Sequence, residues 1–370
     1  MKIDNVRAIP LRLPLVNDSV DGTQDDLLIR IETDEGVIGY GEVDSSPGVA
    51  AAVLEASMSH GISYGLADIL IGRNPLHIAQ LWDEMYRKTV YHGRSGPVLH
   101  AMSGVEMALW DIAGKVRGEP IHQMLGACYR EKVLAYASTL MPDSPGAARD
   151  LAAEFTDLGF HAMKFGWGPI GQSQTLDREL FEAVREGAGP TARIMIDAGQ
   201  VYRVKEAVRT AELLQDLGMY WLEEPLDPDD LDGYARLSQS VSISIAAGEA
   251  ESGLAAFRRL IDVGMVDIIQ PDLSRAGGIL LSRTVAQMAE QSKRRVIPHA
   301  FKSNLLLAAS LHFCAATRDS DMIEYSMSTS PIRQHLTQQR LPLVDGYVDV
   351  PTAPGLGVEV DLEVLRALTY

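Results

Sequence analysis

Three acidic residues stand 26 positions apart in this chain: Asp197, Glu223 and Glu249. Each comes at the end of a short apolar run of the kind that forms a buried strand in a parallel sheet. The carboxyl ends of successive strands meet at one face of such a sheet, so we expect the three side chains to converge. Three negative charges that close together need a cation. The spacing therefore predicts a metal site.

The chemistry of these ligands favours Mg²⁺. An all-oxygen set suits a hard cation that keeps open positions for water or substrate. Zinc is disfavoured because the trio contains no His, and Cys128 and Cys314 are too few for a thiolate site or a disulfide framework. A divalent ion that holds two substrate oxygens can stabilise the enediolate formed when the proton α to a carboxylate is removed. The trio therefore predicts an enzyme acting on a carboxylate.

The elements that must position these residues are eight short apolar runs, which start 23 to 32 residues apart. They cover residues 132–138, 161–167, 193–199, 219–225, 242–249, 266–272, 294–300 and 322–327. Helical segments separate them, which is the pattern of a (β/α)8-type barrel. A doubly wound sheet is the competing fold. The number of runs, and the polar residue near the end of nearly every one, favour the barrel.

Four further polar residues stand at or near the ends of these runs, and each suits a step of the same chemistry. His299 is the candidate base, and Asp272 could bond its far nitrogen, which fixes the tautomer and raises the basicity of the imidazole. Lys164 could neutralise a substrate carboxylate. Glu324 could donate a hydrogen bond to the developing oxyanion if it stays protonated. Each residue alone is more often an ordinary cap or core residue. Seven of them in register favour a shared site.

The residues before and after the predicted barrel indicate a second domain that caps it. Residues 1–127 indicate an N-terminal α+β capping domain, with a strand meander followed by helices. Residues 128–335 form the predicted barrel, and the Gly- and Pro-rich segment 336–370 is expected to return to the cap. The polar loops at 17–26 and 44–49 are the candidates for contact with the distal end of the substrate.

At these residues the chain resembles the enolase superfamily, and within it the mandelate racemase-like subgroup. The resemblance extends over nearly the whole chain, including the run LLIRIETDEGVIGYGEV in the first domain. It implies a (β/α)7β TIM-type barrel under an α+β cap. It also implies Mg²⁺ on Asp197, Glu223 and Glu249, a His299–Asp272 dyad, and Glu324 as an electrophilic acid. Of the two acids in the LEEP motif it selects Glu223 rather than Glu224. A symmetric homo-oligomer is a further implication.

Two positions depart from the pattern of that subgroup. The family usually carries a Lys-x-Lys pair on the second strand, and here Lys164 matches the first lysine while Gly166 takes the place of the second. Gly199 stands where many relatives have Asn. Without the second base, racemisation by the two-base route is disfavoured. Gly166 either leaves room for a longer substrate or reflects close packing against Trp167.

The interpretation that follows is an acid-sugar dehydratase, a hydro-lyase. It removes the α-proton of an aldonate or aldarate and expels the β-hydroxyl to give a 2-keto-3-deoxy acid, with His299 as base and then acid. A racemase or epimerase that uses Lys302 as a second base is one alternative. A metal-binding paralogue without dehydratase activity is another, although the dyad and Glu324 argue against it. A phosphate-handling barrel is disfavoured, because this chain lacks the Gly-rich loop that such a barrel would carry after the seventh strand.

Composition limits the partners of the chain. The formal net charge of −17 disfavours nucleic acid and anionic membranes. No apolar stretch approaches the roughly 20 residues that span a bilayer, and the N-terminus lacks a signal-peptide core. We therefore expect a cytoplasmic protein whose partner is a small carboxylate.

Overall fold

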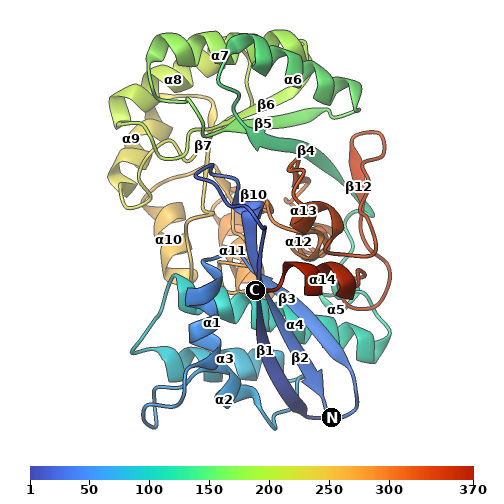
Figure 1. The fold of residues 1–370 in the computed structure, drawn as a ribbon. Helices are drawn as coiled ribbons and strands as arrows, with labels where there is room; N and C mark the ends of the chain where they lie inside the picture. The colour runs from blue at the N-terminus through green and yellow to red at the C-terminus, as the bar shows by residue number, and fades with distance from the viewer.

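The structure is a computed structural model that describes residues 1–370, and it begins with an antiparallel sheet. Its strands, in the order β1-β2-β3, are β1 (Ile3–Arg12), β2 (Asp25–Thr33) and β3 (Ile38–Val43). The helices that follow are α1 (Pro47–Glu55), α2 (Leu66–Leu70), α3 (Ile78–Thr89), α4 (Pro97–Arg117) and α5 (Ile121–Met124). Figure 1 shows β1–β3 and α1–α4 gathered at one end of the molecule. The predicted α+β cap is confirmed, including the β2–β3 hairpin, where Gly36 takes a φ of 81°.

A curled parallel sheet forms the rest of the fold. Its strands are β4 (Lys132–Leu140), β5 (Ala162–Gly166), β6 (Arg193–Asp197), β7 (Trp221–Glu223), β8 (Ser244–Ala247), β9 (Ile268–Ile269), β10 (Arg295–Val296) and β11 (Met322–Ser326). They are hydrogen-bonded in the order β10-β9-β8-β7-β6-β5-β4-β11. All eight predicted runs therefore contain strands, and the TIM-type barrel prediction is confirmed. The two shortest, β9 and β10, end before Asp272 and His299, which are joined by an isolated parallel bridge.

Helices connect these strands and cover the sheet. They are α6 (Pro145–Asp157), α7 (Gln174–Ala188), α8 (Val204–Asp216), α9 (Leu231–Ser240), α10 (Leu254–Asp262), α11 (Ile279–Gln291) and α12 (Asn304–Ala316). Local signals set their starts, since the side chains of Ser144 and Ser173 accept N–H groups in the first turns of α6 and α7. None of the helices combines the length and the apolarity that a membrane crossing requires.

The interior of the barrel holds a layer of apolar side chains with one member from each strand or its continuation. This layer consists of Tyr136, Ala162, Met195, Trp221, Ala246, Ile268, Ile297 and Met322. Because side chains alternate between the two faces of a strand, the residue two positions later points the same way. On seven of the eight strands or their continuations that residue is polar: Ser138, Lys164, Asp197, Glu223, Gln270, His299 and Glu324. The polar site is therefore stacked directly on a packed apolar floor.

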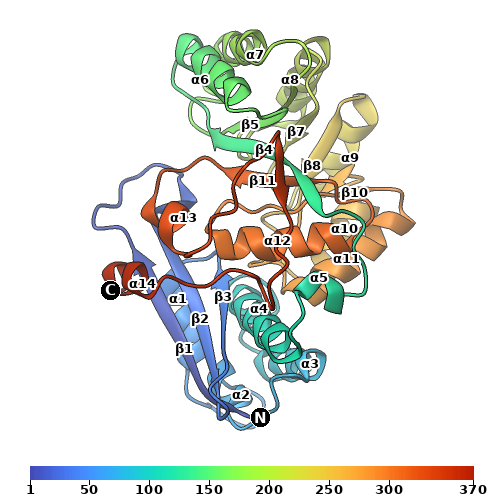
Figure 2. The ribbon, with the colours of Figure 1, turned by 90° about the vertical axis from the view of Figure 1, so that its right-hand side faces the viewer.

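The C-terminal segment contacts both parts of the molecule. Helix α13 (Pro331–His335) directly precedes it, and it contains β12 (Tyr347–Asp349) and α14 (Leu362–Leu368). β12 pairs antiparallel with β4, so the segment first joins the barrel sheet, which the sequence does not predict. Beyond β12 the Ile121 N–H bonds the Gly355 carbonyl at 3.2 Å, and Thr369 bridges to Leu11 of β1. Figure 2 shows α14 beside β1. The proposed limits of the three segments stay a prediction.

A buried histidine pair joins the cap, the barrel and this C-terminal segment. His122 Nδ1 of α5 lies 3.1 Å from His312 Nδ1 of α12, and His312 Nε2 lies 3.1 Å from the Leu356 carbonyl oxygen. The carbonyl only accepts, so Nε2 of His312 carries the hydrogen and a neutral His312 accepts at Nδ1 from His122. Burial lowers the pKa of His312 to about 3.

Acidification should therefore destabilise the protein partly through His312. In the unfolded chain His312 has a pKa of about 6.5, so below that pH it binds a proton there but stays neutral in the folded chain. The free energy of unfolding therefore falls as the pH drops towards 3. Urea denaturation of wild type and His312→Gln should show that wild type loses about 1 kcal/mol more than the variant between pH 6 and pH 5. Parallel losses in the two proteins would exclude His312 as the cause.

Candidate active site

A cavity of about 340 Å³ opens at the carboxyl ends of the barrel strands, beneath the cap. Its size suits a small molecule. The predicted loop 17–26 supplies Ser19 to Gly22 to its wall, and the predicted loop 44–49 supplies Asp44. Its apolar lining residues are Val20, Leu140, Trp167 and Phe301. The rest of the lining is polar or glycine, and much of it belongs to the layer above the barrel floor.

The three acidic residues with the constant spacing lie together at this face. Asp197, Glu223 and Glu249 are buried, and a ligand atom from each lies within 4.8 Å of the others. Glu223 Oε2 accepts N–H groups from Trp221 and Gln270, both at 2.8 Å. Asp197 Oδ1 accepts the Gly199 N–H at 2.9 Å. The convergence predicted from the sequence is present in the structure.

Lys164 is the cation nearest to this trio. Its Nζ donates to Glu223 Oε1 and lies 2.9 Å from Glu324 Oε1 and 3.9 Å from Asp197 Oδ2. Burial opposes its charge, but Glu223 and Glu324 raise the pKa of Lys164 well above its usual value. It is therefore a fixed ammonium group that compensates part of the negative charge.

The donor set fits a hard divalent cation. The trio offers only carboxylate oxygens, which Mg²⁺ prefers. Burial and mutual repulsion raise the pKa of Asp197 well above its usual value and also raise that of Glu223, so one ammonium group does not compensate these charges. Gln270 Oε1 is buried beside Glu223 without a hydrogen-bond partner, which leaves an acceptor for a water that accompanies an ion.

Removing the Lys164 ammonium should destabilise the chelated protein more than the Mg²⁺-loaded one. Lys164→Met leaves buried carboxylates without their cation, at a cost of about 3–5 kcal/mol in the free energy of unfolding with EDTA at pH 8. Mg²⁺ should restore much of this loss because it binds the same carboxylates. Lys115→Met is the matched control, since Lys115 pairs with buried Asp111 at 2.8 Å within α4. An Mg²⁺ effect of equal size in both variants would contradict the assignment.

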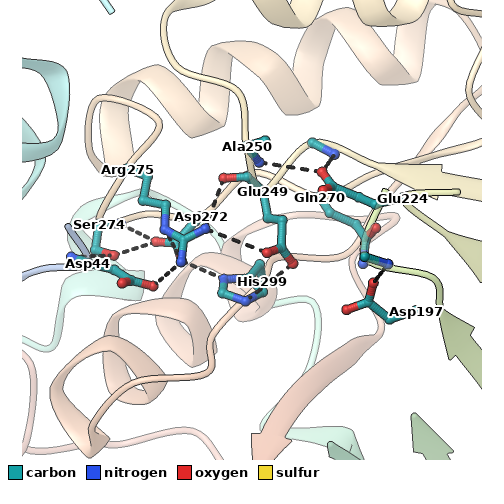
Figure 3. Close-up of polar contacts among 12 residues, drawn as sticks. Asp44, Asp197, Glu224, Glu249, Ala250, Gln270, Asp272, Ser274, Arg275 and His299 are labelled. Carbon is teal, nitrogen blue, oxygen red and sulfur yellow. Dashed lines mark hydrogen bonds and ion pairs between the residues drawn. The ribbon is translucent and has the colours of Figure 1, made fainter. Parts of the chain in front are cut away.

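His299 and Asp272 form the contact that the sequence predicts. His299 Nδ1 lies 2.6 Å from Asp272 Oδ2, so Nδ1–H donates to that carboxylate. Asp272 Oδ1 in turn accepts the Ser274 N–H at 2.6 Å and the Ser274 hydroxyl at 2.5 Å. His299 Nε2 faces the other way, 3.3 Å from Glu249 Oε2, as Figure 3 shows. The dyad thus directs Nε2 toward the trio.

The charges around His299 and Glu324 control their protonation. Burial opposes the charge of His299, but Glu249, Glu324 and Asp272 raise its pKa to about 10. One of these negative charges must be compensated before the imidazole can accept a proton. Burial favours a neutral Glu324, but Lys164 and His299 lower its pKa to about 2. These neighbours do not support the expected neutral Glu324, which instead accepts from Ser138 at 2.7 Å and the Ala300 N–H at 2.8 Å.

A second charged cluster joins the cap to the dyad. Arg275 donates to Asp44 Oδ2 and lies 3.6 Å from Glu249 Oε1 and 3.9 Å from Asp272 Oδ2. Figure 3 shows Arg275 between Asp44 and Glu249. Asp44, Asp272 and His299 also lie close enough to hold an ion. However, Arg275 and the dyad contact already compensate their charges, so this group is the weaker metal candidate.

Lys302 lines the cavity on the cap side but is poorly suited to act as a base. Its Nζ donates to the Asp25 carbonyl at 2.9 Å and lies 3.3 Å from Asp44 Oδ1. Burial opposes its charge, yet Asp44 and Asp26 raise the pKa of Lys302 above its usual value. A permanent ammonium group cannot accept a proton, which weakens the epimerase alternative.

Glu224 lies next to the trio but points elsewhere. It has a left-handed φ of 35°, and its carboxylate accepts from Gln200 at 2.6 Å and from the Gly248 N–H at 3.4 Å. Figure 3 shows its contact with the Ala250 backbone, beside Glu249. These bonds hold the chain on both sides of Glu249. The geometry is consistent with Glu223 as the ligand and Glu224 as its support.

At both departures from the family pattern, Gly166 and Gly199, neighbouring residues leave no space for a side chain. A Cβ at Gly166 would lie 2.6 Å from Asp197 Cβ, so Gly166 does not open free space for a longer substrate. A Cβ at Gly199 would lie 2.7 Å from Cδ2 of Trp167. Close packing therefore explains both glycines better than added room does.

Sequence reasoning missed Arg275, Gln270 and Ser138 as parts of the site. Gln270 and Ser138 are uncharged, but each lies two residues after a member of the apolar floor, which is the signal that could have found them. Arg275 lies in the turn after β9, and nothing in its local pattern indicates a partner in the cap. Its contact with Asp44 depends on how the two domains meet.

The chain matches known protein families over most of its length. Residues 147–364 match the family described as enolase C-terminal domain-like, and residues 5–126 match the mandelate racemase / muconate lactonizing enzyme N-terminal domain. D-galactarolactone cycloisomerase of Agrobacterium fabrum is 35% identical over 92% of this chain and 90% of its own. D-xylonate dehydratase of Haloferax volcanii is 32% identical over 94% of this chain and 86% of its own.

A solved structure has the same fold from end to end. The 3,6-anhydro-D-galactonate cycloisomerase of Zobellia galactanivorans superimposes with a TM-score of 0.92 at 29% identity, and the match covers 100% of both chains. This chain is therefore similar to proteins named as dehydratases and to proteins named as cycloisomerases.

Proposed function

The chain belongs to the mandelate racemase and muconate lactonizing enzyme family of the enolase superfamily, and from that membership we propose that it is an Mg²⁺-dependent acid-sugar dehydratase. The substrate is an aldonate or aldarate, and the product is a 2-keto-3-deoxy acid. One observation carries the proposal: a buried carboxylate trio faces a single His–Asp dyad, and Gly166 stands on β5 in place of the second lysine. The relative named D-xylonate dehydratase supports the same reaction class.

Each residue has a defined part in this reaction. Mg²⁺ on Asp197, Glu223 and Glu249 would supply positive charge for the oxygens of the substrate carboxylate. Lys164 adds a fixed positive charge beside the trio. Asp272 holds His299 with Nε2 directed into the site, and Nε2 is the atom that takes the α-proton. Glu324 holds Lys164 and His299 in place through its charge.

The elimination balances with one acid–base residue. The α C–H bond breaks as Nε2 takes the proton, a carbon–carbon double bond forms, and the β C–O bond breaks. The same imidazolium then protonates the departing hydroxyl to give water, which is a syn elimination. The resulting enol tautomerises to the 2-keto acid. A racemase would instead need an acceptor on the opposite face, where Gly166 at the end of β5 is followed by Trp167.

A related elimination is the second candidate, because a relative at 35% identity is named as a cycloisomerase. If the β-oxygen belongs to a ring, the same proton removal breaks the ring C–O bond and releases no water. His299 would serve both reactions. The difference lies in the substrate rather than in the catalytic groups.

A product screen tests the proposal. Purified protein with Mg²⁺ is incubated with linear aldonates and aldarates and, separately, with their lactones, and 2-keto acids are detected with semicarbazide. We expect a keto acid from at least one linear acid and no product after EDTA treatment. Product from lactones alone would replace the dehydratase by a ring-opening enzyme. If none of these acids or lactones gave a product despite bound Mg²⁺, the result would favour a paralogue without this activity.

A further inference from the structure

The indole of Trp167 lies beside the carboxylate trio and lines the cavity, in a position that the proposed reaction does not use. Trp167 follows β5 directly, is half-buried and lines the cavity. Its Nε1–H donates to Asp197 Oδ2 at 3.1 Å. The other oxygen of that carboxylate accepts from Gly199. Both oxygens of one candidate metal ligand are therefore held from outside the trio.

Two glycines make this position of the ring possible. A Cβ at Gly199 would lie 2.7 Å from Cδ2 and 2.8 Å from Cε3 of Trp167, so the indole packs closely over the Gly199 backbone. Gly199 has a φ of 57°, a left-handed conformation that Asn tolerates better than most residues, so the contact with the ring adds to the backbone conformation in excluding a side chain there. On β5, Gly166 meets the root of the Asp197 side chain in the same way.

The backbone of Trp167 is itself in an unfavourable conformation. Its φ is 59°, in the left-handed region that bulky residues rarely adopt. Its backbone N–H donates to the Asp197 carbonyl at 3.1 Å, so Trp167 is bonded to Asp197 twice. Residues held in such conformations gather at functional sites, where surrounding contacts outweigh the strain.

We propose that Trp167 is a positioning residue that orients Asp197 for the cation and closes the wall of the cavity on the β5 side. The inference rests on the proposed Mg²⁺ site. An indole N–H only donates, so this wall offers no acceptor for a proton. The ring therefore accounts for the departure at Gly199, where it leaves no space for a side chain, whereas a side chain at Gly166 would meet Asp197, the residue that the ring holds.

Metal affinity measures this role without any substrate. Titration calorimetry of the intact protein with Mg²⁺ should show binding about 10- to 100-fold weaker in Trp167→Phe than in wild type. Phe keeps an aromatic ring but loses the N–H. Trp82→Phe is the matched control, since Trp82 is also half-buried and donates its N–H to the Gly277 carbonyl at 2.8 Å, outside the trio. Its Mg²⁺ affinity should equal that of wild type.

A second variant guards against a simple folding defect. Gly199→Ala places a methyl group against the ring and should weaken Mg²⁺ binding in the same direction, while Trp167→Phe with Gly199→Ala should lose less than the two losses combined because both disturb one contact. With an active substrate, saturating Mg²⁺ should restore most of kcat to Trp167→Phe. A residue needed only for folding would not be rescued in this way.

The outcomes separate this inference from the proposed function. Wild type that binds Mg²⁺ while Trp167→Phe binds it equally well would overturn the positioning role and leave the reaction untouched. Wild type without measurable Mg²⁺ binding would overturn both. Weaker binding in Trp167→Phe with no change in Trp82→Phe is the result that we expect.

Discussion

Replacing His299 by Asn should lower kcat by about 10³-fold or more, while Mg²⁺ affinity changes little. A positioned acid–base residue contributes roughly 10²–10⁴-fold, and here one residue serves both the proton removal and the departure of the hydroxyl. Asn preserves much of the shape and can still donate to Asp272, which accepts from Nδ1 at 2.6 Å in wild type. The measurement is the rate of keto-acid formation at saturating substrate, beside a calorimetric Mg²⁺ titration.

His312→Gln is the matched control for this substitution, because His312 is also a fully buried histidine but lies away from the cavity. It should keep its turnover at pH 7.5. A kcat in His299→Asn within a few-fold of wild type would remove His299 from the proton transfer. Loss of turnover together with loss of Mg²⁺ binding would assign it to the metal site instead.

Glu223→Gln should weaken Mg²⁺ binding by more than about 100-fold, a larger effect than the loss of an outer contact to a ligand. The substitution removes a ligand charge, and the new amide has no good orientation. Lys164 donates to one oxygen of Glu223, and Trp221 and Gln270 donate to the other. In either orientation the NH₂ group of the new glutamine would therefore face a donor instead of an acceptor. Calorimetry with Mg²⁺ measures the loss.

Glu224→Gln is the neighbouring control with the same chemical change. Its carboxylate accepts from Gln200 and from backbone N–H groups near Glu249, outside the trio. We expect a loss of Mg²⁺ affinity of about 10-fold at most. If Glu224→Gln abolished binding and Glu223→Gln did not, the ligand assignment within the LEEP motif would be reversed.

The site residues at the strand ends could be predicted from the sequence because two regular spacings determine where they fall. The βα spacing sets one strand after another, and the alternation of side chains sets which residues face inward, so Lys164, Asp197 and Glu223 fall two residues after the apolar floor. Glu249 departs from this register by one residue. Gly248, with a φ of 138°, stands at the regular position, and the turn that it begins brings Glu249 to the trio.

Other parts of the site depend on contacts that no local period encodes. Arg275 meets Asp44 across the junction of cap and barrel, over 231 residues of sequence. The charge of Glu324 depends on Lys164 and His299 together, so a carboxylic acid expected from the resemblance is surrounded by cations. Of the two interpretations of Gly166, room for a longer substrate and close packing, the structure supports packing, but against Asp197 rather than Trp167. Such features need the three-dimensional arrangement.

In the proposed reaction the α-proton of a sugar acid is removed from one face only, and elimination follows. The most direct measurement incubates an active substrate with the protein and Mg²⁺ in D₂O and examines the recovered acid and the product by NMR. We predict a 2-keto-3-deoxy product and no C2 epimer of the substrate that carries deuterium. A deuterated C2 epimer would show proton transfer on both faces and would contradict the one-face mechanism.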